Sequence, residues 1–226
     1  SAIDINNDRK IDIIVGGSSV AGSYPLSEKT YVMLNKGNGA FEPIYNKSLD
    51  TTKLVNDIQV NDIDNDGADE IIIACEWGPI RIYKNVKNAL QEITADLQLN
   101  TKTGWWNSIN LHDFDNDGDL DLFVGNETTP GTTAPCQLFR NDGDNGFIDI
   151  AISAGVTNDR FTKGISWGDY NNDRFPDLYI SNFRGKNRLY KNNGNGTFTD
   201  VAEELSVSNP ISSFPAWFWD FDNDGN

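Results

Sequence analysis

Hydrophobic and polar residues alternate along short stretches of this chain. Residues Ile58–Asn61 and Ile165–Gly168 place an apolar side chain at every second position. Short, mostly apolar runs also recur, at Ile11–Val15, Ile71–Ala74, Leu120–Val124 and Leu178–Ile180. Both patterns are rich in β-branched and aromatic residues and predict β-strands. No stretch of useful length has apolar residues at helical spacing, so we predict an all-β fold.

A nine-residue acidic loop separates each alternating stretch from the apolar run that follows it. It carries oxygen side chains at positions 1, 3, 5 and 9, and its five copies begin at residues 4, 62, 113, 169 and 220. Repeats of about 50 residues indicate solenoids, propellers or arrays. The fifth copy, Asp220–Gly225, ends before its ninth position. Because the chain opens and closes inside this motif, we expect it to be a piece of a longer protein.

A second motif follows each apolar run, at residues 32–41, 137–147 and 188–198. Two apolar stretches flank a turn rich in Asn and Gly, which accept positive φ, so the motif predicts a hairpin. The copy at residues 82–90 lacks the glycines and has Leu90 in place of the recurring Phe. We expect this Phe, and the aromatic residues Tyr83, Phe139 and Tyr190, to pack between neighbouring repeats.

Each repeat thus supplies four antiparallel strands, which is the composition of a β-propeller blade. We predict one β-propeller region over residues 1–226. Its whole blades lie at about 53–103, 104–160 and 161–211, and its partial blades at about 1–52 and 212–226.

The two motifs together resemble FG-GAP/VCBS repeats, which form the propeller of integrin α-subunits. The segments Gly164–Asp173 and Arg188–Val201 are most similar to the ASPIC/UnbV (cartilage acidic protein-like) group. The resemblance covers essentially the whole chain. It implies a parent of about seven blades, whose remaining blades would be partners of this piece. The C-terminal domain typical of that group is not in this sequence.

The acidic loops are predicted to bind calcium, which takes six to eight oxygen ligands. Side chains at positions 1, 3, 5 and 9 supply oxygens, and the family pattern adds the backbone carbonyl at position 7. The loops contain no Cys or His, so they lack the ligands that zinc and copper prefer. We expect about four ions, held by Asp4, Asn6, Asp8, Lys10, Asp12, Asp62, Asp64, Asp66, Ala68, Glu70, Asp113, Asp115, Asp117, Asp119, Asp121, Asp169, Asn171, Asp173, Phe175 and Asp177. An EF-hand is excluded because position 12 is apolar and the flanks are strands.

The copies are not equivalent. Position 6 is glycine in the second and third loops but arginine, Arg9 and Arg174, in the first and fourth. If position 6 needs positive φ, arginine there costs on the order of 1 kcal/mol. The first and fourth loops also have Asn at position 3, and Glu70 makes the ninth ligand of the second loop less certain. We predict tightest binding at Asp113–Asp121, weaker binding at the first and fourth loops, and little at the fifth.

Charge supports this picture and excludes some functions. The formal net charge is −16, from 34 acidic and 18 basic residues, and more than half of the acidic residues lie in the five loops. Such a chain does not offer a basic groove for nucleic acid. No apolar run approaches the length of a membrane span.

The sequence offers little catalytic chemistry. The one histidine, His112, is expected on a strand that faces solvent or a neighbouring blade. Metal binding accounts for most of the clustered carboxylates, so we predict that the protein is not an enzyme. Cys75 and Cys136 are expected to be buried thiols, with a disulfide between adjacent repeats as the alternative.

Two functions remain open. The first is a secreted or cell-surface scaffold, stiffened by calcium, that meets a protein or glycan on one propeller face. The second is a carbohydrate-binding or polysaccharide-lyase-type propeller, in which Trp77 and Trp105 would stack on sugar rings. Packing between blades is expected for Trp106, Trp167 and Trp217.

Overall fold

The computed structural model describes residues 1–86, 89–129, 131, 133–143, 146–220 and 222. Their regular structure consists of sixteen β-strands, the 3-10 helix η1 (Lys47–Thr51) and the short helix α1 (Ala151–Ala154). Neither of these helices is long enough to cross a bilayer. The chain divides into two compact units, Ser1–Trp106 and Asn107–Asn226.

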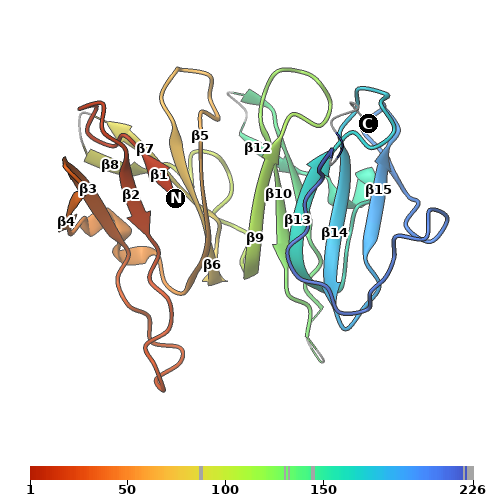
Figure 1. Ribbon diagram of the computed structural model, residues 1–226, viewed down its shortest axis with the longest axis horizontal. Coiled ribbons are helices and arrows are strands. Elements are labelled where there is room, and N and C mark those ends of the chain that lie inside the picture. The colour runs from red at the N-terminus through yellow and green to blue at the C-terminus, as the bar shows by residue number, and fades with distance from the viewer. Residues whose placement is uncertain (87–88, 130, 132, 144–145, 221, 223–226) are drawn as a thin grey trace. The chain divides into compact units, whose positions relative to one another are not determined.

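The first eight strands lie in the first unit and pair antiparallel in two sets of four (Figure 1). In the first, the strand order is β1 (Ala2–Ile3), β2 (Asp12–Val15), β3 (Tyr31–Gly37) and β4 (Ala40–Ile44). In the second, the strands pair in the order β5 (Val55–Asn61), β6 (Glu70–Gly78), β7 (Arg81–Val86) and β8 (Ala89–Glu92). The blade expected to be partial at residues 1–52 therefore also has four strands, although β1 has only two residues.

Strand β9 (Gly104–His112) begins in the first unit, where its Trp105 pairs with Glu76 of β6. In the second unit it is followed by β10 (Asp121–Asn126), β11 (Gln137–Asn141) and β12 (Phe147–Asp149). The last sheet has the order β13 (Phe161–Gly168), β14 (Asp177–Phe183), β15 (Arg188–Asn192) and β16 (Phe198–Asp200). The all-β prediction and the four-stranded antiparallel blades of a propeller are confirmed.

The apolar runs become the second strand of each blade. Residues Ile71–Ala74 of β6 and Leu122–Val124 of β10 are at most 1% exposed. Strands buried on both faces read as continuous apolar runs rather than alternating ones, which is why these segments lack a polar face. Each unit builds its own core around such a strand: the first contains Ile71, Ile73 and Tyr83, and the second Phe123, Leu178 and Tyr190.

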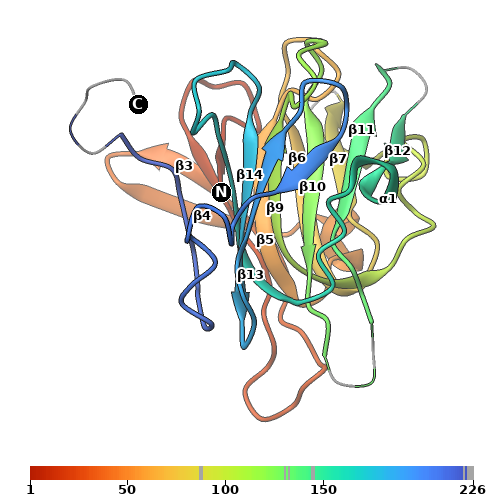
Figure 2. The same cartoon turned by 90° about the vertical axis from the view of Figure 1, so that its right-hand side faces the viewer.

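Each acidic loop joins the first and second strands of its blade, as predicted. In the first unit the loops β1–β2 and β5–β6 lie at the same end of their sheets (Figure 1). In the second unit the loops β9–β10 and β13–β14 likewise share one end (Figure 2). The strand after a loop carries the chain away from it, so Glu70 lies beside the second acidic loop and Gly78 at the opposite end of β6.

The predicted aromatic packing holds except at two positions. Tyr83, Phe139 and Tyr190 are at most 4% exposed, and the hairpin residues Phe147 and Phe198 are at most 7% exposed. The equivalent Phe41 is 39% exposed, because it lies on the edge strand β4, where most side chains are exposed. The prediction that Trp217 packs between blades is wrong as well: it is 70% exposed, in a segment after β16 that joins no described sheet.

Candidate functional site

The carboxylate at position 1 closes each acidic loop by accepting two backbone hydrogen bonds. In the third loop, Asp113 accepts from the N–H groups of Asp117 at 3.1 Å and Gly118 at 3.0 Å. The same pair of bonds recurs in the other loops, at Asp4, Asp62 and Asp169. An ionised carboxylate has about four lone-pair sites, so position 1 can hold the turn and still bind a cation.

The turn depends on left-handed backbone at positions 4 and 6. Position 4 is asparagine in each described loop, with φ between 56° and 61° at Asn7, Asn65, Asn116 and Asn172. Asn is the residue, after Gly, that adopts this conformation most readily. Position 6 has φ of 67°, 86°, 97° and 70° at Arg9, Gly67, Gly118 and Arg174. The condition set from the sequence, that position 6 needs positive φ, is met. The part played by the position-4 asparagines was not predicted, although their recurrence was visible.

The middle of the loop is held by short-range bonds to position 5. The backbone N–H at position 7 donates to the carboxylate at position 5, at 2.9–3.0 Å, in residues Lys10, Ala68, Asp119 and Phe175. In the first and fourth loops the position-3 side chains Asn6 and Asn171 accept from the N–H at position 5, each at 3.0 Å. Coordination by the carbonyl at position 7 stays a prediction.

The acid at position 9 is buried beneath the loop. Asp12, Glu70, Asp121 and Asp177 are at most 1% exposed. Asp121 accepts from the N–H groups of Phe114 at 3.0 Å and Asn141 at 2.9 Å. Burial raises the pKa of Asp121 to about 7 and that of Asp177 to about 6, against the lowering effect of these backbone hydrogen bonds. A metal ion beside such a buried, hydrogen-bonded carboxylate would stabilise its charged form.

The asparagine that opens each hairpin turn ties the hairpin to the acidic loop. The backbone N–H of Asn35, Asn141 and Asn192 donates to the position-9 carboxylate of the same blade at 2.8–2.9 Å. The Asn192 side chain also donates from Nδ2 to the Phe114 carbonyl, at 2.8 Å, which lies at position 2 of the third loop. Asn85 donates in the same way to the Ile5 carbonyl of the first loop. These positioning residues were read only as turn formers in the sequence.

The third loop brings three carboxylates close together. Asp113, Asp115 and Asp121 each offer a carboxylate oxygen, and these atoms lie within 4.8 Å of one another. Asp115 Oδ1 is buried and has no hydrogen-bond partner among the described residues. Burying such an oxygen unpaired is costly, and a ligated calcium ion would remove that cost. In the second loop, carboxylate oxygens of Asp62, Asp64 and Asp66 likewise lie within 4.8 Å of one another.

A separate group of aromatic residues lies in the first unit, at the end of β6 farthest from its acidic loop. Trp77 is 59% exposed, and its ring centroid lies 5.2 Å from that of Trp105. Trp77 Nε1 donates to the Tyr24 hydroxyl at 2.7 Å, and that hydroxyl donates to Glu76 at 3.0 Å. The two predicted stacking residues are therefore brought together, and Tyr24 joins them unpredicted.

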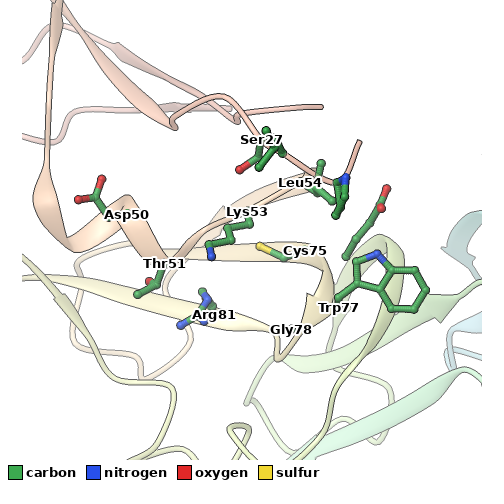
Figure 3. A pocket seen from close by; sticks show the side chains of 12 residues that line it. Ser27, Asp50, Thr51, Lys53, Leu54, Cys75, Trp77, Gly78 and Arg81 are labelled. Carbon is green, nitrogen blue, oxygen red and sulfur yellow. The ribbon is translucent and has the colours of Figure 1, made fainter. Parts of the chain in front are cut away.

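Trp77 stands at the edge of a cavity of about 770 Å³ (Figure 3). Asp50, Lys53 and Arg81 also line this cavity. The backbone of Trp77 has φ of 61°, a left-handed conformation that is unusual for a bulky residue. Strain of this kind recurs at ligand sites, because the surrounding structure must enforce it.

Comparison with known proteins identifies the family of this chain. The profile of the FG-GAP-like repeat matches residues 4–73, 62–124 and 169–226, which is well over half of the chain. The chain belongs to the FG-GAP-like repeat family.

Relatives of this FG-GAP-like chain include cartilage acidic protein 1. The Xenopus tropicalis protein is 35% identical over 140 residues, and the Homo sapiens protein 30% over 141 residues. Each match covers 60% of this chain but only 20% of the relative, so the chain spans about one fifth of their length. Among solved structures, an Agrocybe aegerita lectin described as recognising non-reducing terminal N-acetylglucosamine matches with a TM-score of 0.52 and 17% identity. That match covers 93% of this chain and 52% of the lectin. It shows the fold alone.

The other residues of the FG-GAP-like chain that the sequence singled out are the histidine, a third tryptophan, the two cysteines and the acids of the fifth loop. His112 lies on β9 and stacks on Trp167 of β13, with centroids 5.8 Å apart, so it faces the neighbouring blade as expected. Trp106 is 1% exposed and donates from Nε1 to the Gly78 carbonyl. Cys75 and Cys136 are both free, buried thiols, as expected. The fifth loop has Asp220 and Asp222 in the described chain, and its Asp224 lies outside it.

Proposed function

We propose that this chain is a calcium-binding, non-catalytic propeller scaffold that works outside the cell and presents one face to a protein or glycan partner. The observation that carries the proposal is the third loop, where Asp115 Oδ1 is buried without a hydrogen bond beside Asp113 and Asp121. Oxygen ligands alone suit calcium better than zinc or copper. Extracellular modules can use weak calcium sites because calcium there is millimolar.

The non-catalytic part of the proposal follows from how the acids are used. The acids at position 9 accept backbone hydrogen bonds beneath the loops, and those at position 1 close the turns. The histidine is stacked against Trp167 rather than paired with a nucleophile. These groups hold the blades, so calcium would stabilise structure rather than assist a reaction.

Calcium titration by calorimetry tests the proposal at the third loop. Replacing Asp115 with Asn removes one ligand charge and should weaken binding at one site by at least about tenfold, or about 1.4 kcal/mol. The matched control is Asp119→Asn, which removes the same charge from the same loop at a position whose side chain is not a predicted ligand. It should change affinity less than about threefold. Equal losses in both variants, or no calcium binding by the native chain, would contradict the proposed site.

Carbohydrate binding is the second candidate, and the pairing of exposed Trp77 with half-buried Trp105 favours it. Aromatic faces stack on the apolar faces of sugar rings, and the cavity beside Trp77 supplies Asp50, Lys53 and Arg81 as hydrogen-bond partners for hydroxyl groups. The lectin of the same fold supports the idea that such a sheet arrangement can present a sugar site.

A glycan array probed with the native chain and with Trp77→Ala tests this candidate. The substitution should reduce the signal of any bound sugar by about tenfold or more, since one aromatic contact is worth about 1 kcal/mol beyond the area it buries. Trp219→Ala is the control, because Trp219 is 74% exposed and is not among the residues that line the cavity. Absence of any bound glycan removes this candidate and leaves the scaffold function untouched.

A further inference from the structure

The second acidic loop already contains a cation, which comes from the protein itself. Lys84 lies on β7, directly before the hairpin asparagine Asn85. Its Nζ forms an ion pair with Asp64, lies 2.7 Å from Asp66 Oδ2 and lies 3.5 Å from Glu70 Oε1. The ammonium thus occupies the space between the carboxylates that the repeat uses elsewhere as predicted calcium ligands.

The equivalent residues of the other blades do not enter their loops in this way. In the first blade the position is Leu34, which has no charge. Arg140 turns to Asp142 in its own hairpin, with Nε 2.6 Å and Nη2 3.0 Å from the carboxylate oxygens. Lys191 forms no ion pair within the part of the chain that the structure describes. The arrangement of Lys84 is therefore a property of the second blade and not of basic residues at this position in general.

The ninth position of the second loop differs in a matching way. Glu70 is one methylene longer than the aspartates of the other loops, and its Oε2 accepts from the Ile63 N–H at 3.1 Å. Its Oε1 is buried and has no hydrogen-bond partner among the described residues, and Lys84 is the cation that faces it. Because its side chain is longer, Glu70 brings this oxygen close to the Lys84 ammonium. An aspartate at this position would reach only the backbone N–H groups.

Lys84 is held firmly enough to compete with an ion. Its side chain is only 22% exposed. Its ammonium is paired with two carboxylates at once, those of Asp64 and Asp66. A calcium ion that entered the loop would have to displace a paired charge and solvate it elsewhere.

We propose that Lys84 is the resident cation of the second loop, so that calcium binds there only by displacing it and the second loop is a weak, lysine-blocked site. The part that concerns calcium rests on the proposed function. It reverses the sequence-based expectation that the glycine at position 6 makes the second loop one of the better sites.

The first arm of the test uses calcium-free protein and does not depend on metal binding. Lys84→Met keeps the apolar stem and removes the charge, leaving Asp64, Asp66 and Glu70 to repel one another. In EDTA this variant should lower Tm by about 2–4 °C, the shift that corresponds to about 1 kcal/mol in a chain of this length. Lys191→Met, the matched control, should change Tm by less than about 1 °C.

The second arm titrates calcium itself by calorimetry. Lys84→Met should gain one site, or tighten one site, by at least about tenfold, and the added change Asp64→Asn should abolish that gain. Lys191→Met should change affinity less than about threefold.

The outcomes separate the two proposals. If the native chain binds calcium but Lys84→Met gains nothing, the lysine-blocked site is overturned and the calcium function stands. If no variant binds calcium but Lys84→Met alone loses stability in EDTA, Lys84 is confirmed as the resident cation and the calcium function fails. A Tm unchanged by Lys84→Met in EDTA overturns the resident cation.

Discussion

Arginine occupies the sixth position of the first and fourth acidic loops in a backbone conformation that favours glycine. Arg9 has φ of 67° and Arg174 has φ of 70°, while the glycines of the other two loops have φ of 86° and 97°. A side chain in this region crowds the following carbonyl oxygen. The loop nevertheless holds this conformation, because the carboxylate at position 1 accepts a hydrogen bond from the backbone N–H of Arg9 or Arg174.

Arg9→Gly and Arg174→Gly should therefore each stabilise the protein by up to about 1 kcal/mol. The unfolding free energy from urea titration measures the effect. Gly67→Ala is the reciprocal change: no atom lies within 4 Å of the added Cβ, so backbone strain is the main cost, and it should destabilise by about 1 kcal/mol. Destabilisation by both arginine replacements would show that their side chains make contacts worth more than the strain.

The buried acids at position 9 give calcium-free protein a defined pH dependence. The pKa of Asp121 is raised to about 7 and that of Asp177 to about 6, mainly by burial. An unfolded aspartate has a pKa of about 3.9, so the fold takes up protons. A raised pKa in the folded state contributes stability below the unfolded pKa, and that contribution is lost as pH rises through the folded value.

In EDTA, stability should accordingly fall as pH rises from about 4 to about 7. Bound calcium requires the charged carboxylates, so in saturating calcium stability should instead fall as pH drops. Urea unfolding at a series of pH values, with EDTA and with calcium, gives both curves. Parallel curves would mean that the acids at position 9 do not respond to the ion.

At the scale of the elements, the hairpin asparagine joins three parts that are distant in sequence. Asn192 belongs to β15, its backbone donates to Asp177 at the start of β14, and its side chain donates to the Phe114 carbonyl in the loop of the preceding blade. Its Oδ1 accepts from the N–H of Gly194 in the turn. The acidic loop, the hairpin and the neighbouring blade therefore share one side chain.

Asn192→Ala should destabilise the second unit by about 1–3 kcal/mol, because buried carbonyl groups lose their donor. It should also weaken calcium at the third loop by about tenfold or more, as loss of an outer-shell residue commonly does. Asn193→Ala is the control one residue away: this side chain is exposed and, within the described residues, forms hydrogen bonds with Thr197 and Thr199. Equal effects of the two substitutions would argue against the coupling.

For the whole molecule, calcium should be a major term in stability because the formal net charge is −16 and most acids are grouped in the loops. A site saturated at 100 times its Kd contributes about 2.7 kcal/mol, which corresponds to a Tm rise of about 5–10 °C for a chain of this length. Thermal unfolding monitored by circular dichroism, with calcium and with EDTA, measures the rise. Magnesium at the same concentration should give a smaller rise, because it demands stricter geometry and keeps its waters.

The sequence by itself determined the repeat, the strands and the position of the loops. Residues that recur with a fixed period must take the same local structure, and alternation, glycine turns and oxygen spacing are local signals. The glycines at position 6 of two copies also raised the question of left-handed backbone at Arg9 and Arg174, since copies of one turn share one conformation.

Only the tertiary structure decided how the side chains of different elements meet. The coupling made by Asn192 depends on a carbonyl 78 residues away, and the exposure of Trp217 depends on whether a sheet lies against it. The same holds for Lys84, which reaches Asp64 across 20 residues and fills a loop that looks open in the sequence. The loop motif in the sequence shows which oxygen ligands are present. Packing between strands decides which of those oxygens are available to bind a metal ion.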